Sequence, residues 1–385
     1  MEQNYDFDEI RCYNDSEVPE KLGKLVDRPE IEAFVKAAFP EIDMNALRAQ
    51  IKQITTIDDF QKTVISRFVF DMLKKTCASF EVYGAEKVDR ESASLFITNH
   101  RDIVFDPSLV CGALFKNNLK TAQVAIGDNL FAYDWIEELV RLNKCFVVKR
   151  NVPVRQMLDV SKRLSAYIHY TINEKKTPVW IAQREGRSKD SKDDTQPSVV
   201  KMLALGGGTR DIIQNIRKLN VQPMTLCYEY DPCDFLKAAE FQLKRDDPEW
   251  KKSKQDDVIS MSTGITTNKG RVSVVFGDRL NPIFDTYPWI DDRNAQVNCI
   301  CSLIDKTIHS NYVLYPINYV AYDLKYDNEK YVSKYTAEEK VKVMDYLNGQ
   351  LAKVKIPNPD NDFLWDMLLT MYSNPVVNKE KAFGL

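Results

Sequence analysis

From residue 80 onward, short apolar runs alternate with longer segments of helical periodicity, and this alternation limits the fold more than any other feature of the sequence. The predicted strands are 80–83, 95–98, 122–126, 145–148, 178–182, 223–228 and 272–276. Helices are predicted between them near 106–116, 134–142, 153–173, 199–205 and 209–218. Strands separated by helices are typical of a layered α/β domain, here with a central, largely parallel or mixed sheet.

The segments on either side of this pattern are assigned by their periodicity and polarity. Residues 1–27 are polar and are predicted to form an extended arm, whereas 29–75 has the spacing of three successive amphipathic helices. We therefore expect an arm and a small helical bundle over 1–78, followed by an α/β domain with C-terminal helices over 79–385. Within that domain the predictions are a charged surface hairpin or mobile loop at 243–270, helices near 291–309, 336–352 and 361–372, and a strand at 319–324.

Composition excludes several classes of protein. A net charge of −3 argues against nucleic acid as a partner, since nucleic-acid-binding domains are usually strongly basic. The eight cysteines form no CxxC pair, so we expect reduced thiols and neither a zinc site nor a disulfide framework. The sequence shows no signal peptide and no apolar run long enough to span a bilayer. We expect a cytoplasmic protein and leave open a peripheral contact with the inner face of the membrane.

The polar residues that follow the strand at 95–98 are the first candidate site. Asn99, His100, Arg101 and Asp102 lie at its carboxyl end, and Asp106 lies at the start of the next helix. Ligands bind at this edge in open α/β sheets, and a histidine with a nearby carboxylate has the parts of a general base and its orienting partner. A structural interpretation, in which His100 caps the strand and Asp106 caps the helix, fits this stretch equally well.

Two further strands are followed by cations. Lys149 and Arg150 come after the strand at 145–148, and a turn with Glu185, Gly186 and Arg187 comes after the strand at 178–182. In a parallel sheet these ends share one edge with His100, and arginine is well shaped for bidentate phosphate contact. The set therefore indicates a phosphate-bearing substrate. Ordinary surface ion pairing would explain any one of these residues but explains the set less well.

Other motifs favour structural roles. The glycine run at 206–208 follows a predicted helix and lacks the P-loop lysine and hydroxyl residue, so it is interpreted as a helix stop. His169 and His309 lie in predicted helices without a placed carboxylate and are expected to be structural. The absence of a GxSxG motif disfavours a Ser-His-Asp hydrolase.

Together, four blocks resemble the glycerol-phosphate acyltransferase superfamily. They are Asn99-His100 with Asp106-Pro107, then 146–150, then 185–188, and finally the strand that opens with Pro223. Within the superfamily, which includes glycerol-3-phosphate and 1-acylglycerol-3-phosphate acyltransferases, the sequence is most similar to the soluble, plastid-type glycerol-3-phosphate acyltransferases. The resemblance covers roughly residues 80 to 280.

Two spacings depart from the family pattern. His100 and Asp106 have five residues between them where the family has four, so a bulge at the turn would be needed, and Asp102 is the alternative partner. The family's Glu-Gly-x-Arg block is here Glu185-Gly186-Arg187, one residue short, which leaves open whether Arg184 or Arg187 meets the phosphate.

The resemblance implies acyl transfer in phospholipid synthesis, from acyl-CoA or an acyl-carrier protein to a hydroxyl of glycerol 3-phosphate or 1-acylglycerol 3-phosphate. His100 would act as general base and Asp106 would orient it. Lys149, Arg150 and Arg187 would bind the phosphate, while Glu185 and Gly186 shape the turn. No metal or redox cofactor is expected. The alternatives are a lipid- or acyl-carrier-binding protein that kept the fold but lost the chemistry, and a thioester hydrolase.

Overall fold

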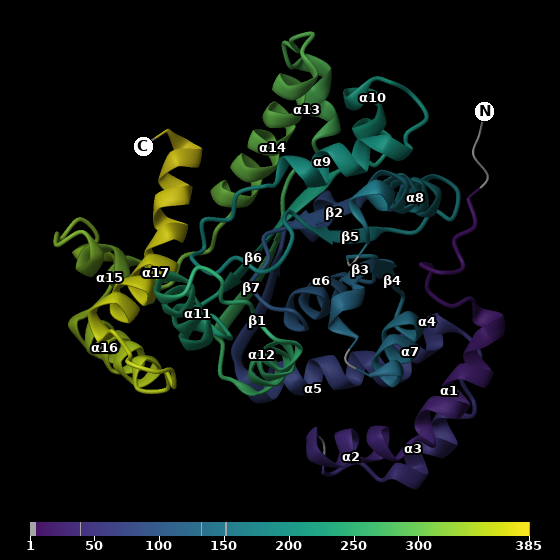
Figure 1. The fold of residues 1–385 in the computed structure, drawn as a ribbon, viewed down its shortest axis with the longest axis horizontal. Coiled ribbons are helices and arrows are strands. Elements are labelled where there is room, and N and C mark those ends of the chain that lie inside the picture. Colours follow the sequence, from purple (N-terminus) through teal and green to yellow (C-terminus); the bar gives the residue numbers. More distant parts are fainter. Residues whose placement is uncertain (1–4, 39, 132, 151, 385) are drawn as a thin grey trace.

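Seven strands form one sheet at the centre of the molecule (Figure 1). The computed structural model describes residues 5–38, 40–131, 133–150 and 152–384. The strands are β1 (Cys77–Tyr83), β2 (Leu95–Thr98), β3 (Gln123–Gly127), β4 (Cys145–Val148), β5 (Val179–Ala182), β6 (Gln222–Tyr228) and β7 (Gly270–Phe276). Each corresponds to a strand predicted from the sequence, with ends that differ by three residues or fewer.

The sheet is mostly parallel, which confirms the predicted fold class. The strand order is β1-β7-β6-β2-β5-β3-β4, and every neighbouring pair is parallel except β6 and β7. Strands β2 to β6 therefore run in one direction, and their carboxyl ends lie at one edge of the sheet. The segments that follow β2, β4 and β5, which carry the predicted site residues, begin at this edge.

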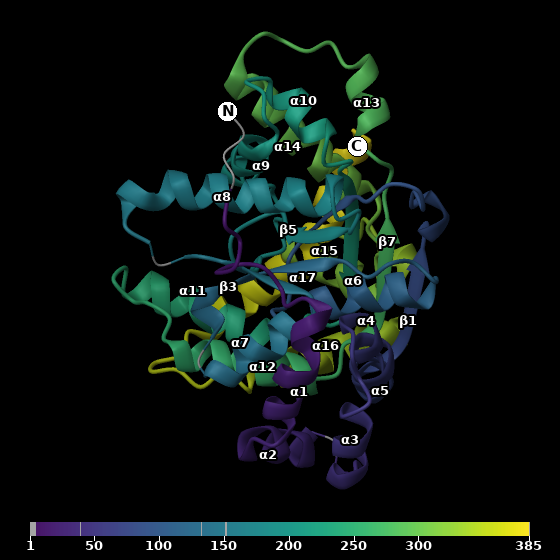
Figure 2. The same cartoon turned by 90° about the vertical axis from the view of Figure 1, so that its right-hand side faces the viewer.

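Helices cover both faces of the sheet. On one face lie α8 (Val154–Asn173), α9 (Pro197–Leu203) and α14 (Arg293–Ser310), and on the other lie α5 (Ser66–Thr76) and α6 (Phe105–Lys116), as Figures 1 and 2 show. Alternate strand residues point to opposite faces. In β2, Leu95 and Ile97 pack into the core with α8, whereas Phe96 packs into the core with α6. All four β2 residues are buried, which explains why this strand appears in the sequence as an unbroken apolar run.

The N-terminal segment is helical, and the predicted extended arm over 1–27 is wrong for part of its length. Helix α1 (Val18–Val26) buries an apolar stripe against the other N-terminal helices and α7 (Asp134–Leu142). The helices expected between residues 29 and 75 are present as α2 (Pro29–Ala38), α3 (Met44–Ile51), α4 (Ile57–Phe60), a π-helical turn (Gln61–Ile65) and α5. The division of the chain at residue 78 stays a prediction.

Two further predictions of secondary structure are wrong. The segment 243–270 was expected to be a hairpin or mobile loop, but it contains the end of α11 (Asp234–Asp246) and all of α12 (Lys254–Thr266), which begins with a capping box between Ser253 and Asp256. The strand expected at 319–324 belongs to helix α15 (Pro316–Lys325), because Val320 and Ala321 bury against the long C-terminal helix. At 319–324 tertiary packing overrides the local strand propensity, whereas α12 begins with a local capping signal in the sequence.

The remaining helices complete the face that carries α14. They are α10 (Ile212–Arg217), α13 (Asn281–Thr286), α16 (Ala337–Leu351) and α17 (Asn361–Phe383). The predictions at 291–309 and 336–352 are confirmed, whereas α17 extends beyond the predicted end at 372 and contains Pro375 within it. Across the described ranges, none of the helices combines the length and apolar character needed to cross a membrane.

Candidate active site

The structure brings His100 and Asp106 together. Nδ1 of His100 lies 2.7 Å from Oδ2 of Asp106. His100 is the second residue after β2, and Asp106 is the second residue of α6, so the connection between strand and helix sets their separation. Asp106 is fully buried, and the side chain of His100 keeps 15% of its exposure. This leaves the second ring nitrogen of His100, Nε2, for a proton transfer to a bound molecule.

The five residues between His100 and Asp106 include a turn that leads into α6. Ile103 and Val104 form that turn, and Oδ1 of Asp102 accepts hydrogen bonds from the backbone N–H groups of Val104 (2.9 Å) and Phe105 (2.7 Å). Asp102 therefore closes the start of the helix and does not pair with His100. Burial, with a contribution from the neighbouring Asp106, raises the pKa of Asp102.

Asp106 is held by more than the histidine. Its Oδ2 also accepts hydrogen bonds from the backbone N–H groups of Arg101 (2.6 Å) and Asp102 (3.0 Å), and its Oδ1 accepts one from the hydroxyl of Tyr228 (2.7 Å). Our reading of the sequence missed Tyr228. Tyr228 could have been found from its position, because it is the last residue of β6 and so lies at the same edge of the sheet as the other site residues.

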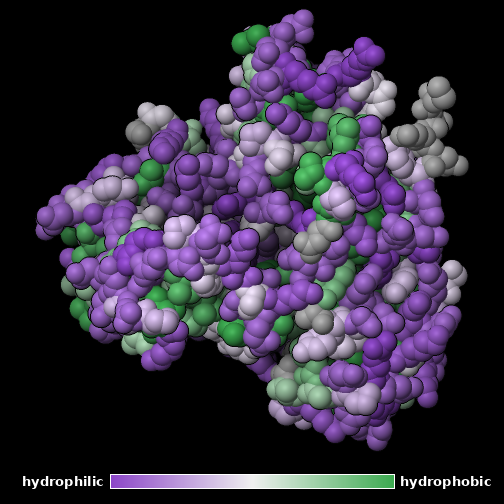
Figure 3. All heavy atoms as spheres, viewed as in Figure 1, coloured by the Kyte–Doolittle hydropathy of each residue, from purple (hydrophilic) through white to green (hydrophobic). Residues whose placement is uncertain are grey.

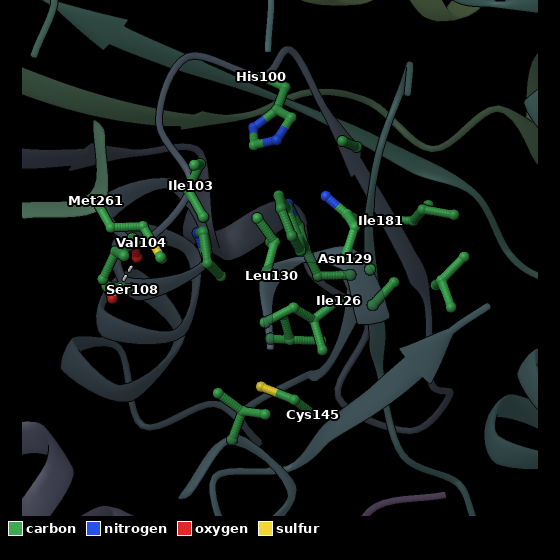
Figure 4. Close-up of a pocket in the computed structure, with 18 of the residues that line it drawn as sticks. His100, Ile103, Val104, Ser108, Ile126, Asn129, Leu130, Cys145, Ile181 and Met261 are labelled. Carbon is green, nitrogen blue, oxygen red and sulfur yellow. Dashed lines mark hydrogen bonds between the residues drawn. The ribbon is translucent and has the colours of Figure 1, made fainter. Parts of the chain in front are cut away.

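A large cleft of about 1320 Å³ opens beside His100. Its walls come from α5, α6, β3, α7, β4, α8, β5 and α12 and are mostly apolar. In Figure 4 His100 lies at one end of the part drawn and Cys145 at the other, with Ile126, Leu130 and Ile181 between them. A cleft of this shape can take a long hydrocarbon chain with one end at the histidine.

The predicted cations line the same cleft. Lys149, Arg150 and Arg187 all contribute to it, as does Arg184. Nη1 of Arg150 forms an ion pair with Oε1 of Glu185 at 2.8 Å, which joins the segment after β4 to the segment after β5. Gly186 follows with a φ of +71°, a left-handed conformation that favours glycine, so it fits the expected role of shaping this turn.

Arg187 differs from the other cations in its surroundings. Its Nη1 is buried and has no hydrogen-bond partner among the described residues. Burial lowers the pKa of Arg187, but the nearby Cys233, Asp102 and Asp231 more than offset this and the net shift is upward, so the guanidinium stays charged. A buried, charged donor without a partner in a cleft is a natural place for an anion. Of the two arginines left open by the sequence, Arg187 is the one with a buried donor that has no partner among the described residues.

The other histidines lie away from this cleft and bind backbone. Nε2 of His169 lies 3.0 Å from the carbonyl oxygen of Leu203, and Nε2 of His309 lies 3.0 Å from that of Asp193. Both fit the structural role expected from the sequence. Within the described ranges no group of three or more His, Cys, Asp or Glu side chains is arranged to hold a metal ion.

The segment that holds the edge-of-sheet blocks is similar to a known family of domains. Residues 79–226 match the model of the Acyltransferase family. The matched segment includes His100, Asp106, Arg150 and Arg187. The match confirms the resemblance to the glycerol-phosphate acyltransferase superfamily that the four sequence blocks indicated.

Among solved structures, the chain is similar to the 1-acyl-sn-glycerophosphate (LPA) acyltransferase PlsC from Thermotoga maritima. The identity is 13%, the likeness covers 74% of this chain and 94% of that one, and the TM-score is 0.34. With a TM-score this low the likeness adds no weight of its own, and the assignment depends on the family match. No curated protein matches the sequence.

Proposed function

We propose that this protein transfers a fatty acyl group from a thioester, acyl-CoA or acyl-carrier protein, to a hydroxyl of glycerol 3-phosphate or 1-acylglycerol 3-phosphate. The observation that carries the proposal is the position of His100 in one cleft. The same cleft is lined by mostly apolar side chains and by Arg187, whose buried Nη1 has no partner among the described residues. An acyl chain and a phosphate are the two chemical parts that this reaction must bring to one base.

The proposed chemistry needs only side chains of this chain and its substrates. His100 Nε2 takes the proton of the acceptor hydroxyl while its oxygen attacks the thioester carbonyl. The tetrahedral intermediate then expels the thiolate, and the imidazolium returns the proton to that sulfur, so the products are an ester and a thiol. Asp106 fixes the ring tautomer and stabilises the imidazolium. No metal or redox cofactor takes part in this scheme.

The cations would fix the acceptor. Arg187 would bind the phosphate through its open donor, and Lys149 and Arg150 would add charge at the same edge. Glu185 would act indirectly by holding Arg150, and Gly186 would permit the turn that sets both loops. Fixing the phosphate orients the hydroxyl toward His100, which is the usual gain from a charged anchor remote from the reacting atom.

We place the proposed reaction in the cytoplasm, with peripheral contact to the inner face of the membrane. In support, hydrophobic side chains reach the surface near the hollow in the middle of one face (Figure 3). At the start of α8, Val154 is 85% exposed, and Met157 and Leu158 are also exposed, with Met157 lining the cleft. Binding to vesicles of anionic lipid that weakens in Leu158→Asp would support this contact, and equal binding by both proteins would exclude this surface.

The decisive experiment is thiol release from acyl-CoA and acyl-carrier protein, with glycerol 3-phosphate, with 1-acylglycerol 3-phosphate, and without acceptor. We expect acceptor-dependent release, reduced about 10³-fold in His100→Ala. His169→Gln, which changes a histidine outside the cleft, is the control and should retain activity. Thiol release at the same rate with and without acceptor would favour a hydrolase. Binding of substrates with no turnover in a folded protein would favour a lipid- or acyl-carrier-binding protein.

A further inference from the structure

The carboxylate of Asp106 is fixed at both oxygens. It lies in the first turn of α6 and is completely buried. Oδ2 accepts hydrogen bonds from the backbone of Arg101 and Asp102 and is paired with His100, so three groups surround that one oxygen. The other oxygen, Oδ1, has a hydrogen bond from a single side chain, the hydroxyl of Tyr228 at 2.7 Å.

Tyr228 reaches Asp106 from a distant part of the chain. It is the last residue of β6, 122 positions after Asp106, and it is buried among apolar side chains that include Phe105. Burial, followed by the effect of Asp106, raises the pKa of Tyr228 well above its ordinary value, so the hydroxyl keeps its proton and acts only as a donor to the carboxylate. Strand β6 thus supplies the one side-chain donor, other than the histidine, that binds this carboxylate among the described residues.

We propose that Tyr228 is a positioning residue for the His100–Asp106 pair: it holds the Asp106 carboxylate in the plane that His100 requires and takes part of its charge. The inference rests on the proposed function of His100 as the base. Without the hydroxyl, Oδ1 would be buried with no donor, and the carboxylate could rotate about its terminal bond. Its full charge would then act on His100, and the imidazolium would be stabilised more than in the wild type.

Loss of the Tyr228 hydroxyl can change the His100–Asp106 pair in two ways, and both shift the pH dependence in the same direction. If the charge of Asp106 acts more strongly on His100, the imidazolium loses its proton at a higher pH. If Asp106 itself becomes a better base, the pair also holds its proton to a higher pH. The other charged and titratable groups near the pair and Tyr228, unchanged by removal of the hydroxyl, are Arg101, Asp102, Arg187, Lys269, Cys77 and Cys233.

The test is Tyr228→Phe, which removes the hydroxyl and keeps the ring. We expect kcat to fall roughly 10-fold with KM for both substrates unchanged, because the effect is on the base and not on binding. The acidic limb of the profile of kcat/KM against pH should move up by about 0.5–1 pH unit. The matched control is Tyr167→Phe, a buried tyrosine whose hydroxyl donates to Gln123 at 2.8 Å, away from this pair.

A second readout does not depend on turnover. The chain has three histidines, and the NMR signals of His100 are assigned as those missing from the spectrum of His100→Ala. We expect Tyr228→Phe to raise the titration midpoint of His100, and to leave it unchanged when Asp106→Asn is already present.

The outcomes separate the two hypotheses. An active wild type with no shift of His100 in folded Tyr228→Phe would overturn the role of Tyr228 and leave the proposed reaction intact. A wild type without acyl transfer, in which Tyr228→Phe still shifts His100, would overturn the reaction and keep the coupling. An equal shift in Tyr228→Phe with and without Asp106→Asn would show that Tyr228 acts by another route, against the proposal.

Discussion

Gly264 of α12 packs directly against the carboxylate of Asp102. A Cβ atom placed on Gly264 would lie 2.2 Å from Oδ2 of Asp102, closer than real contacts allow. Asp102 closes the start of α6, and Met261 and Ile265 of α12 line the cleft. The close approach of helix and carboxylate therefore connects one wall of the cleft to the turn that carries His100.

Gly264→Ala should force α12 or the Asp102 turn to move. We expect thermal stability to fall and acyl transfer to drop by about tenfold or more, because small displacements at a base are costly. Gly23→Ala is the control, since a Cβ there meets nothing within 4 Å. That change lies within α1 and should be neutral or stabilising by up to about 1 kcal/mol, as replacing glycine in a helix usually is. Equal activity in the two variants would show that the contact is dispensable.

Arg187→Gln should weaken the phosphate acceptor selectively. Loss of a charged hydrogen bond predicts a KM for the acceptor raised roughly 10–100-fold, with little change in the KM of the thioester. Arg184→Gln tests the neighbouring arginine, which lines the same cleft. Steady-state kinetics with the acceptor varied would decide between them. A larger effect in Arg184→Gln would assign the phosphate to that residue instead.

Cys145→Leu should shorten the acyl chains that the cleft accepts. Cys145 lies at the opposite end of the drawn cleft from His100 (Figure 4), and leucine would occupy volume there. We expect kcat/KM to fall roughly fourfold for each methylene that no longer fits, and to stay unchanged for short thioesters. The measurement is a series of acyl-CoA lengths, with Cys145→Ala as a variant that adds no volume. A uniform loss at every length would contradict the prediction.

Asp305 should make stability depend on pH. Its Oδ1 accepts hydrogen bonds from the backbone N–H of Thr195 (2.8 Å) and from its hydroxyl, but burial dominates and raises the pKa of Asp305 to about 7 from 3.8. A raised pKa means that the folded state holds the proton more tightly, so this contribution is present at low pH and is lost as pH rises through about 7. Unfolding by urea between pH 5 and 8 should show a smaller loss in Asp305→Asn. Parallel curves for wild type and variant would refute this assignment.

Three of the strands, β2, β4 and β6, were predictable because their residues are buried on both faces. Strand β2 has no exposed position, so it appears in the sequence as an apolar run, and the same holds for most of β4 and β6. The pairing of His100 with Asp106 was also accessible, since both residues flank one short turn. Buried strands and short turns are determined by residues that are close together in the sequence, so the sequence alone predicts them.

The rest of the site depends on contacts between distant segments. Tyr228 reaches Asp106 from β6, and Gly264 reaches Asp102 from α12, in a segment for which the sequence predicts a hairpin or mobile loop. Arg150 and Glu185 were both expected near the phosphate, but nothing in their spacing indicated that they form an ion pair with each other. The burial of Nη1 of Arg187 likewise results from the folded chain, and the residues next to Arg187 in the sequence do not indicate it.

The segment after β5 is hydrogen-bonded both to the turn that carries His100 and to the C-terminal helix α17. The backbone N–H of Ser188 donates to the carbonyl of His100 at 2.7 Å, and Asp193 pairs with Arg101 at 2.5 Å. On its other side, Asn378 of α17 donates to the carbonyls of Ser191 and Lys192, both at 3.0 Å. The last helix therefore holds the segment after β5, and that segment in turn holds the backbone of His100. Shortening α17 before Asn378 would remove these hydrogen bonds and so weaken the support of the turn that carries His100. The sequence of the cleft itself would be unchanged.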